Sequence, residues 1–463
     1  MTTLFRKFLP AAVAVLLFFT LAALYFAPQF GGDVLPQHDV RQYEGASREI
    51  HRTREAYGED PQWIGSMFGG MPAYLVDVRY PAQLVKDAAV PLTRAVPIPA
   101  GLIFFAMCAF WVMLRMMKID PWVGIVPSLA YGLSTYFLLI IGAGHLTKMW
   151  ALVYAPPMMG GIWMTLRGGR PGWGGALTAL FASLEIGANH PQITYYFLLA
   201  MAALWISEGI VAFRKKHLPS FARRTAVLLG AGILAVGSNF APLWYTMHHS
   251  KQTIRGGSEL AAGEETSQEG LALDYATAWS YGRAESWNLL IPDFMGGDSG
   301  RAFTRDGEMA KALKPYGLES FAEQLPAYWG EQPYTAGPTY LGAAALFLAL
   351  LGLLLASGRN KWWIAAVSLL TLLLAWGHNF MGFTEFAFKY LPGYNKFRTV
   401  SMALVVVEWT VPLLAALALM PLWRGEVPRR KLLRALAWAG GITGGFCLLF
   451  AVAGSAIFDF GRT

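Results

Sequence analysis

The segment Gln37–Tyr43 places a dense group of polar side chains directly after the first long apolar run of the chain. Asp39 offers a carboxylate there, with His38 and Gln42 as neighbouring hydrogen-bonding groups. A carboxylate in this position could take a proton from a hydroxyl or bind a divalent cation such as Mg²⁺ or Mn²⁺. Asp39 followed three residues later by Gln42 is also a capping-box pattern, in which the carboxylate caps a helix. The two roles are compatible, and both stay open at this point.

Further cationic, imidazole and amide side chains occur in polar segments that follow later apolar runs. These candidates are His145, Lys148, Asn189, His190, Arg255, Lys396 and Arg398. Cations stabilise the charge on a departing phosphate, and a carboxylate can act as base toward an acceptor hydroxyl. The set therefore indicates sugar transfer from a lipid phosphate, with Asp39 as the catalytic residue and the others as substrate-binding residues. Each residue taken alone also has an ordinary explanation, as a snorkelling cation or a helix end.

These residues must be positioned by membrane-spanning helices. Of the 463 residues, 55% are hydrophobic and 14% are charged, whereas about a quarter are charged in a typical soluble domain. A span needs about 20 apolar residues. About eleven segments qualify, at approximately 9–29, 98–117, 122–142, 149–166, 174–188, 191–212, 225–245, 338–357, 362–377, 401–421 and 435–456. The sequence thus predicts an all-α polytopic membrane protein.

Basic residues set the expected orientation. Arg6 and Lys7 precede the first segment, and further Lys and Arg clusters follow the second, fourth, sixth, eighth and tenth segments. All of them lie on one side of the membrane, and the positive-inside rule makes that side cytoplasmic. The amino terminus is then cytoplasmic, and the formal charge of +8 reflects these loops rather than binding of nucleic acid.

Two long loops, about 30–97 and 246–337, are then extracytoplasmic parts of a single integral domain over 1–463. Apolar residues from Val40 to Tyr57 recur at helical spacing between charges, which predicts an amphipathic helix in the interface plane. A second helix is expected over about 274–290. The aromatic and polar segment Tyr328–Tyr334 suits a sugar, but it is also typical of an interfacial aromatic belt.

The chain resembles the YfhO-type bacterial membrane proteins of the GT-C glycosyltransferase superfamily. The segments that carry the resemblance run along nearly the whole chain: Gln37–Tyr43, Ser66–Pro72, Gly144–Lys148, Ala188–Tyr196, Arg255–Leu260 and Leu391–Arg398. The resemblance implies a GT-C-like helical bundle, a polyprenyl-phosphate sugar donor, and an acidic catalytic residue in the first extracytoplasmic loop, which corresponds to Asp39. Family members are often much longer, so the chain is expected to be a compact member or a fragment.

Together these observations predict an inverting glycosyltransferase of the bacterial inner (plasma) membrane. It would move a sugar from a polyprenyl-phosphate donor to an envelope glycan, lipid or protein acceptor on the extracytoplasmic side, in contact with membrane lipids. One alternative is a transporter or flippase for a lipid-linked or polar solute, which would place charges near the bilayer midplane on broken helices. Another is a non-catalytic envelope scaffold.

Overall fold

The computed structural model describes residues 2–80, 83–256 and 270–457. They form two compact units, and each is described by itself. Unit 1 comprises residues 1–132 and 140–271, and unit 2 comprises residues 133–139 and 272–463. The described residues are helical apart from loops, isolated bridges and one two-stranded hairpin.

Unit 1 contains most of the first half of the chain. Its helices and strands are α1 (Thr2–Tyr25), α2 (Ala27–Phe30), α3 (His38–Tyr57), β1 (Trp63–Ile64), β2 (Met71–Pro72), η1 (Ala73–Leu75), α4 (Leu84–Thr93), α5 (Ala100–Met116), α6 (Ile125–Gly132), the end of α7 (Thr135–Ala143), α8 (Leu146–Leu166), α9 (Pro171–Gly187), α10 (Pro191–Arg214), α11 (Leu218–Gly237) and α12 (Phe240–Ser250).

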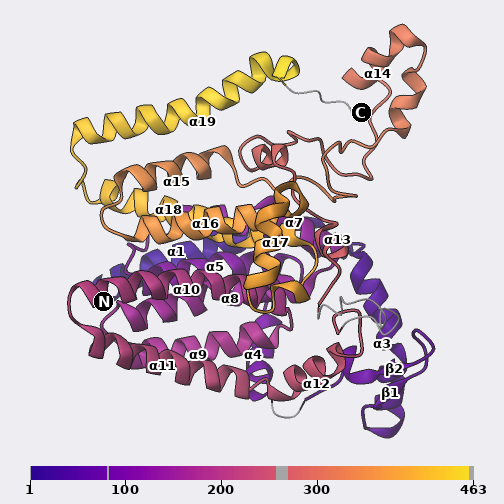
Figure 1. Ribbon diagram of the computed structural model, residues 1–463, viewed down its shortest axis with the longest axis horizontal. Helices are drawn as coiled ribbons and strands as arrows, with labels where there is room; N and C mark the ends of the chain where they lie inside the picture. The colour runs from indigo at the N-terminus through magenta and orange to yellow at the C-terminus, as the bar shows by residue number, and fades with distance from the viewer. Residues whose placement is uncertain (1, 81–82, 257–269, 458–463) are drawn as a thin grey trace. The chain divides into compact units, whose positions relative to one another are not determined.

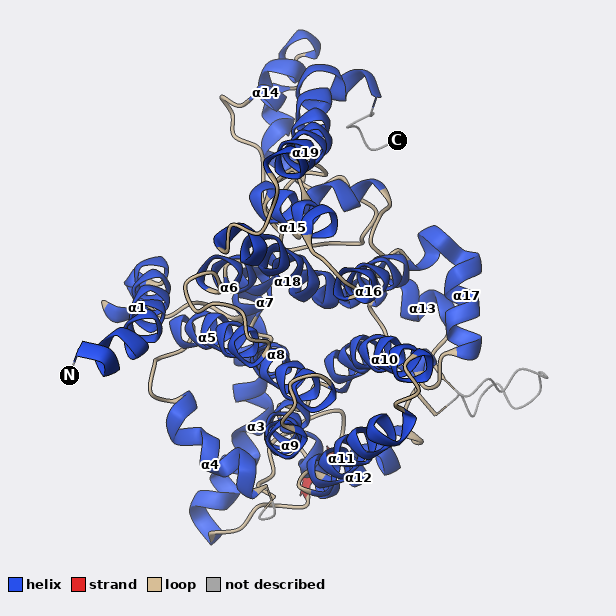
Figure 2. Ribbon diagram, turned by 90° about the vertical axis from the view of Figure 1, so that its left-hand side faces the viewer, coloured by secondary structure: helices blue, strands red, loops and turns tan. Residues whose placement is uncertain are grey.

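Close helix packing holds the centre of unit 1 together. Figure 2 views α8, α9, α10 and α11 nearly end-on as parallel rods of one bundle. α8 and α9 approach each other through small residues: a Cβ at Gly174 would lie 2.5 Å from the backbone nitrogen of Thr165. Such small-residue contacts are typical of helices that pack inside a membrane, where burial of apolar surface gives no extra driving force.

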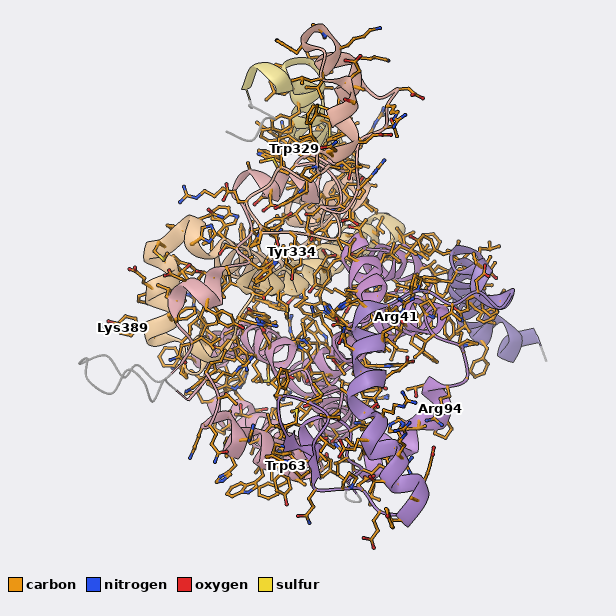
Figure 3. The ribbon with its side chains drawn as sticks, turned by 90° about the vertical axis from the view of Figure 1, so that its right-hand side faces the viewer. Arg41, Trp63, Arg94, Trp329, Tyr334 and Lys389 are labelled. Carbon is orange, nitrogen blue, oxygen red and sulfur yellow. The ribbon has the colours of Figure 1, made fainter. Side chains whose placement is uncertain are left out.

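The predicted amphipathic helix in the first long loop is confirmed as α3. Figure 1 shows α3 running across the direction of α8–α11 at one end of the bundle, and its place in a membrane interface stays a prediction. Ile50 is its buried apolar anchor, and it packs with Ile64 of the hairpin and Ala73. In Figure 3, Arg41 marks the amino-terminal part of α3, and the helix runs from there toward the level of Trp63 in β1. The first loop is thus a folded helix-and-hairpin layer.

Unit 2 contains the second long loop and the last apolar helices. Its elements are the start of α7, α13 (Leu273–Thr277), η3 (Ala284–Leu289), α14 (Glu308–Leu313), η4 (Lys314–Tyr316), η5 (Glu319–Gln324), α15 (Ala343–Leu355), α16 (Asn360–Ala375), η6 (Gly377–Phe380), α17 (Met381–Tyr390), η7 (Tyr394–Lys396), η8 (Val400–Ala403), α18 (Leu404–Trp423) and α19 (Arg429–Ile457). α18 is its central helix and packs against both α15 and α16.

The apolar helices support a multi-pass membrane protein. Among the described residues, six segments are long and apolar enough to cross a membrane: Phe8–Tyr25, Ile125–Ala143, Pro191–Arg214, Leu218–Gly237, Val400–Trp423 and Arg429–Gly454. A seventh is added if α16 and α17, bent by 114°, form one broken span. The other predicted segments fall on shorter or less apolar helices, including α5, α8, α9 and α15. The predicted segment 225–245 was placed too late, because α11 already ends at Gly237.

The single helix predicted over 274–290 is wrong. α13 ends at Thr277 and the 3₁₀ helix η3 begins at Ala284. Between them, the backbone nitrogen of Tyr281 donates to the carbonyl of Ala375 at 2.8 Å. Gly282 donates its backbone N–H to the carboxylate of Glu285 at 2.6 Å. These tertiary and side-chain bonds replace the helical pattern that the spacing of apolar residues favoured.

Candidate functional site

The loop between α7 and α8 approaches the first turn of α3 closely. Gly144 in this loop has φ +91°, and an added Cβ would meet the backbone nitrogen of Val40 at 3.1 Å and the Cβ of Asp39 at 3.3 Å. Only glycine combines this backbone conformation with so little space. The side chain of Gln37 also donates a hydrogen bond to the carbonyl of Ile141. Residues far apart in the sequence are thereby fixed next to each other.

This approach joins Asp39 to His145 and Lys148. The Nε2 atom of His145 lies 3.0 Å from Oδ2 of Asp39. On the other side of the ring, Nζ of Lys148 lies 3.2 Å from Nδ1 of His145. A neutral imidazole with its proton on Nε2 satisfies both contacts, because it donates to Asp39 and accepts from Lys148. The three residues form a chain from a carboxylate through an imidazole to an ammonium group.

The three groups differ in their exposure to solvent. The side chain of Asp39 is 49% exposed, whereas Lys148 is buried at 7% exposure. Burial lowers the pKa of His145 to about 4, helped by the charge of Lys148 and opposed by Asp39. His145 is therefore neutral at pH 7 and keeps the tautomer that both contacts require. The carboxylate is accessible to solvent, while the ammonium group lies buried behind the ring.

His190 adds a second imidazole to the same part of unit 1. It precedes Pro191 at the start of α10, which packs against α8. The pKa of His190 is lowered to about 3, by burial first and then by the charge of Lys148. Its Nδ1 atom is buried and has no hydrogen-bond partner among the described residues. A buried ring nitrogen without a partner is costly and is available to a ligand.

The positions of these side chains on their helices favour an anion. Asp39 lies in the first turn of α3, Lys148 in the first turn of α8, and His145 and His190 directly precede α8 and α10. Helix amino termini carry unpaired N–H groups and a partial positive charge. A phosphate held near Lys148 and His190 gains from this charge.

The predicted capping box at Asp39 is wrong. Gln37 is the residue that precedes α3, and no side chain caps this helix end. Asp39 lies inside the first turn, where its two carboxylate oxygens contact the rings of His145 and His38, the latter at 3.4 Å. The physical reason is that α3 already begins at His38, so Asp39 is its second residue rather than the residue before the helix, and its carboxylate contacts His145 instead.

The other predicted residues of unit 1 have less defined places. His38 and Gln42 are exposed on α3. Asn189 is exposed with φ +61°, so it serves the left-handed turn between α9 and α10. Arg255 is half-buried in the turn after α12, directly before the residues that the structure does not describe. Substrate contacts of these four residues stay predictions.

Lys396 and Arg398 belong to unit 2, so their relation to Asp39 stays a prediction. Arg398 donates a hydrogen bond to the hydroxyl of Tyr275 at 2.8 Å, and its guanidinium lies 5.9 Å from the same ring. Lys396 ends the short helix η7. Both residues lie before η8 and α18 in the chain.

The aromatic segment Tyr328–Tyr334, which was predicted to suit a sugar, is partly buried and makes hydrogen bonds inside unit 2. The hydroxyl of Tyr328 is buried and donates to Glu285 at 2.6 Å, and Gln332 donates to the same carboxylate. Tyr334, in contrast, is 62% exposed and stacks edge-on with Trp279 at 5.2 Å. Trp329 and Tyr334 are labelled in Figure 3. Of this segment, Tyr334 remains accessible to a ligand.

A divalent metal at Asp39 receives little support from the donor set. Mg²⁺ prefers several oxygen ligands, often from more than one carboxylate. Asp39 is instead surrounded by two imidazoles and a nearby buried ammonium group. Within the described ranges, no cluster of three or more His, Cys, Asp or Glu residues could hold a metal ion. No chemical step at Asp39 is therefore derived through a metal.

Two carboxyl groups buried within helices form a further class of functional group. Glu185 in α9 is fully buried, and both of its oxygens accept from the Thr194 hydroxyl, at 3.0 and 2.9 Å. Glu408 in α18 is also fully buried and accepts from the Ser134 hydroxyl. Glu408 was missed because it lies inside a predicted apolar span; a lone acid in such a run is a signal that could have found it.

Comparison with known proteins gives no matching family model, no similar curated protein and no similar solved structure.

Proposed function

We propose that this chain is a membrane glycosyltransferase. It transfers a sugar from a polyprenyl-phosphate donor to a hydroxyl of an envelope glycan, lipid or protein on the extracytoplasmic side of the membrane. The observation that carries the proposal is the half-exposed carboxylate of Asp39, joined through His145 to the buried Lys148. A GT-C-like arrangement with about eleven spans and a YfhO-type relationship are parts of this proposal.

The reaction assigns a separate role to each end of this chain of groups. The acceptor oxygen attacks the anomeric carbon and forms the new glycosidic bond, while the bond between that carbon and the phosphate oxygen breaks. The acceptor proton passes to Asp39, and the leaving polyprenyl phosphate keeps the electron pair. A single displacement of this kind inverts the anomeric configuration. Lys148 and the unpartnered nitrogen of His190 stabilise the charge on the phosphate.

His145 is a positioning residue in this scheme. Its ring holds Asp39 in place and separates the carboxylate from the ammonium group of Lys148. Direct pairing of the two charges would reduce the basicity of Asp39 and neutralise the cation that the phosphate needs. A neutral imidazole between them keeps both groups available.

The proposal is tested by mass spectrometry of envelope glycans from cells with and without the gene. Asp39→Asn should fail to restore a glycan that the wild-type gene restores, whereas Asp33→Asn, an exposed acid on the same loop, should restore it. Size-exclusion profiles of both variants establish that each is folded. A wild-type glycan pattern with Asp39→Asn would contradict the proposal.

A transporter or flippase remains the second candidate function, and specific observations favour it. The candidate span Ile125–Ala143 is interrupted between α6 and α7, and Glu408 lies near the middle of the span Val400–Trp423. Interrupted helices and mid-membrane acids are typical of transporters. Reconstituted protein decides between the two: accumulation of a solute in vesicles without a covalent sugar product would replace the transferase by a transporter.

A further inference from the structure

Glu408 lies at a depth where a charged group is costly. It is the ninth residue of the span Val400–Trp423, which places it about 12 Å along the helix from the start of that span. Its side chain is 0% exposed. One carboxyl oxygen accepts from Ser134, whereas the other, Oε1, is buried without a hydrogen-bond partner among the described residues. A buried ionised carboxylate without compensation is strongly unfavourable, so something must neutralise it.

The helices that pack against α18 do not supply a counter-charge at this depth. α15 contains no ionisable residue over Ala343–Leu355, and η8 contains none over Val400–Ala403. The only charged residue of α16, Lys361, lies in its first turn and donates to the carbonyl of Leu353 at 2.8 Å. Within the described part of these elements, Glu408 therefore faces apolar and hydroxyl groups.

A second buried polar group lies near Glu408. Tyr281 is 2% exposed, and its hydroxyl also has no hydrogen-bond partner among the described residues. Backbone hydrogen bonds join the segment around Tyr281 to two neighbouring elements. The N–H of Tyr281 donates to the carbonyl of Ala375 in α16, and the N–H of Ser401 in η8 donates to the carbonyl of Trp279. The pKa of the Tyr281 phenol is raised well above its usual range, by burial first and then by the charges of Glu285, Glu408 and Tyr328, while the nearby side chain of Asn288 lowers it. Tyr281 thus lies within electrostatic reach of Glu408.

The hydroxyl bonded to Glu408 comes from a break in a helix. Ser134 lies between α6, which ends at Gly132, and α7, which begins at Thr135. The break is fixed by Thr135, whose hydroxyl donates to the carbonyl of Pro338 at 2.8 Å and accepts from the backbone nitrogen of Tyr340 at 2.6 Å. Irregular backbone at membrane depth is tolerated where it is buried in protein or lines a polar cavity.

We propose that Glu408, Ser134 and Tyr281 form a site for one monovalent cation, a proton or Na⁺, inside unit 2. A single carboxylate neutralises one positive charge, and the two hydroxyl oxygens supply neutral ligands. Divalent cations generally need more carboxylate oxygens. The site is separate from the residues proposed for glycosyl transfer, so it stands or falls independently of that function.

The test measures the thermal unfolding temperature of the purified protein by its intrinsic Trp fluorescence. Unfolding is recorded over a pH series in NaCl and in choline chloride of equal ionic strength. A cation that binds only the folded state raises the unfolding temperature. For Na⁺ we expect a rise of about 5 °C relative to choline at alkaline pH, absent in Glu408→Gln and kept in Glu185→Gln. Glu185 is the matched buried carboxyl, since Thr194 already satisfies both of its oxygens.

A proton site gives a different pattern. A proton bound only in the folded state stabilises the protein at low pH, and that stabilisation is lost as the pH rises. Glu408→Gln then removes this part of the pH dependence, and Na⁺ has no effect on the wild type. Ser134→Ala should shift its midpoint toward higher pH, because the carboxylate form loses a hydrogen-bond donor, whereas Thr194→Val should leave the midpoint unchanged.

A third pattern of results would contradict the proposed cation site. If Glu408→Gln keeps the Na⁺ and pH dependence of the wild type, or if the wild type shows neither dependence, Glu408 binds no exchangeable cation. Where Glu408→Gln does not fold, Ser134→Ala and Tyr281→Phe carry the test, since each keeps the carboxyl and removes one hydroxyl. Wild-type midpoints and Na⁺ responses in both of these variants contradict the proposal.

Discussion

Asp39 in unit 1 and Glu408 in unit 2 carry the same functional group in opposite surroundings. Asp39 is half-exposed, lies at a helix amino terminus and contacts an imidazole that leads to Lys148. Glu408 is fully buried in a helix, contacts one hydroxyl and leaves one oxygen without a partner among the described residues. The first environment stabilises a carboxylate that can accept a proton from a substrate. The second favours a carboxyl that holds its own proton or a bound cation.

The two acids differ in their surroundings rather than in their chemical group, and the roles proposed for them follow from those surroundings. Glu185 is an intermediate case that supports this view. It is as buried as Glu408, but Thr194 satisfies both of its oxygens. Both oxygens of Glu185 lie within hydrogen-bond distance of a hydroxyl, whereas one oxygen of Glu408 has no partner among the described residues, and this difference is why the cation site is proposed at Glu408.

The largest expected effect separates Asp39 from Glu408. Asp39→Asn removes the base and should lower the rate of sugar transfer by about 10³-fold. Glu408→Gln should change that rate by less than about tenfold, because Glu408 does not take part in the proposed transfer. The measurement is transfer of radiolabelled sugar from polyprenyl phosphate by protein in liposomes. Equal losses of transfer rate in the two variants would show that Asp39 and Glu408 do not have separate roles.

Lys148→Met should reduce transfer by about 10²-fold, because the departing phosphate loses its main cation. The substitution replaces a buried ammonium group by an apolar chain of similar length, so the folded state should be kept. The readouts are kcat and the unfolding temperature of the same preparation. A variant with normal kcat and an altered unfolding temperature would make Lys148 a structural residue only. Lys86→Met serves as the control substitution.

The pH dependence should identify His145 as the link between Asp39 and Lys148. Its pKa is about 4 in the folded protein, against an ordinary value of 6.5, with burial as the main cause and Lys148 as the second. The unfolded chain therefore binds the proton first, and the stabilisation is lost as the pH falls from about 6.5 toward 4. His145→Gln should flatten the fall in unfolding temperature across this range. An unchanged slope would show that His145 is not the titrating group.

The smallest expected effect concerns the loop that positions His145. Gly144→Ala forces an unfavourable backbone conformation and a close contact with the start of α3, at a cost of about 1–3 kcal/mol. Transfer should fall together with stability, because the same displacement separates His145 from Asp39. Gly142→Ala, at a helical position with no atom within 4 Å of the added Cβ, should leave both unchanged. Thermal unfolding and transfer rate, measured in parallel, check this prediction.

The class of fold and the positions of the polar segments could be predicted from the amino-acid sequence. Apolar runs and charge placement predicted a helical multi-pass membrane protein, and helical spacing predicted α3. These features are local, since hydrophobic periodicity and composition act within one segment. The same local patterns led to the capping box at Asp39 and to a continuous helix over 274–290, and in both places tertiary contacts overrode the pattern.

The contacts between polar side chains depend on tertiary packing and could not be predicted from local patterns. The contact between Asp39 and His145 depends on Gly144 passing close to α3, and the bond between Ser134 and Glu408 depends on a break between α6 and α7. Hydrogen-bond partners and burial are properties of packed elements, so a single sequence does not specify them. The carboxylate in the first loop could therefore be predicted as a candidate base. The acid in α18 stands out in its apolar run, but its bond to Ser134 and its unpartnered oxygen depend on the packed neighbours.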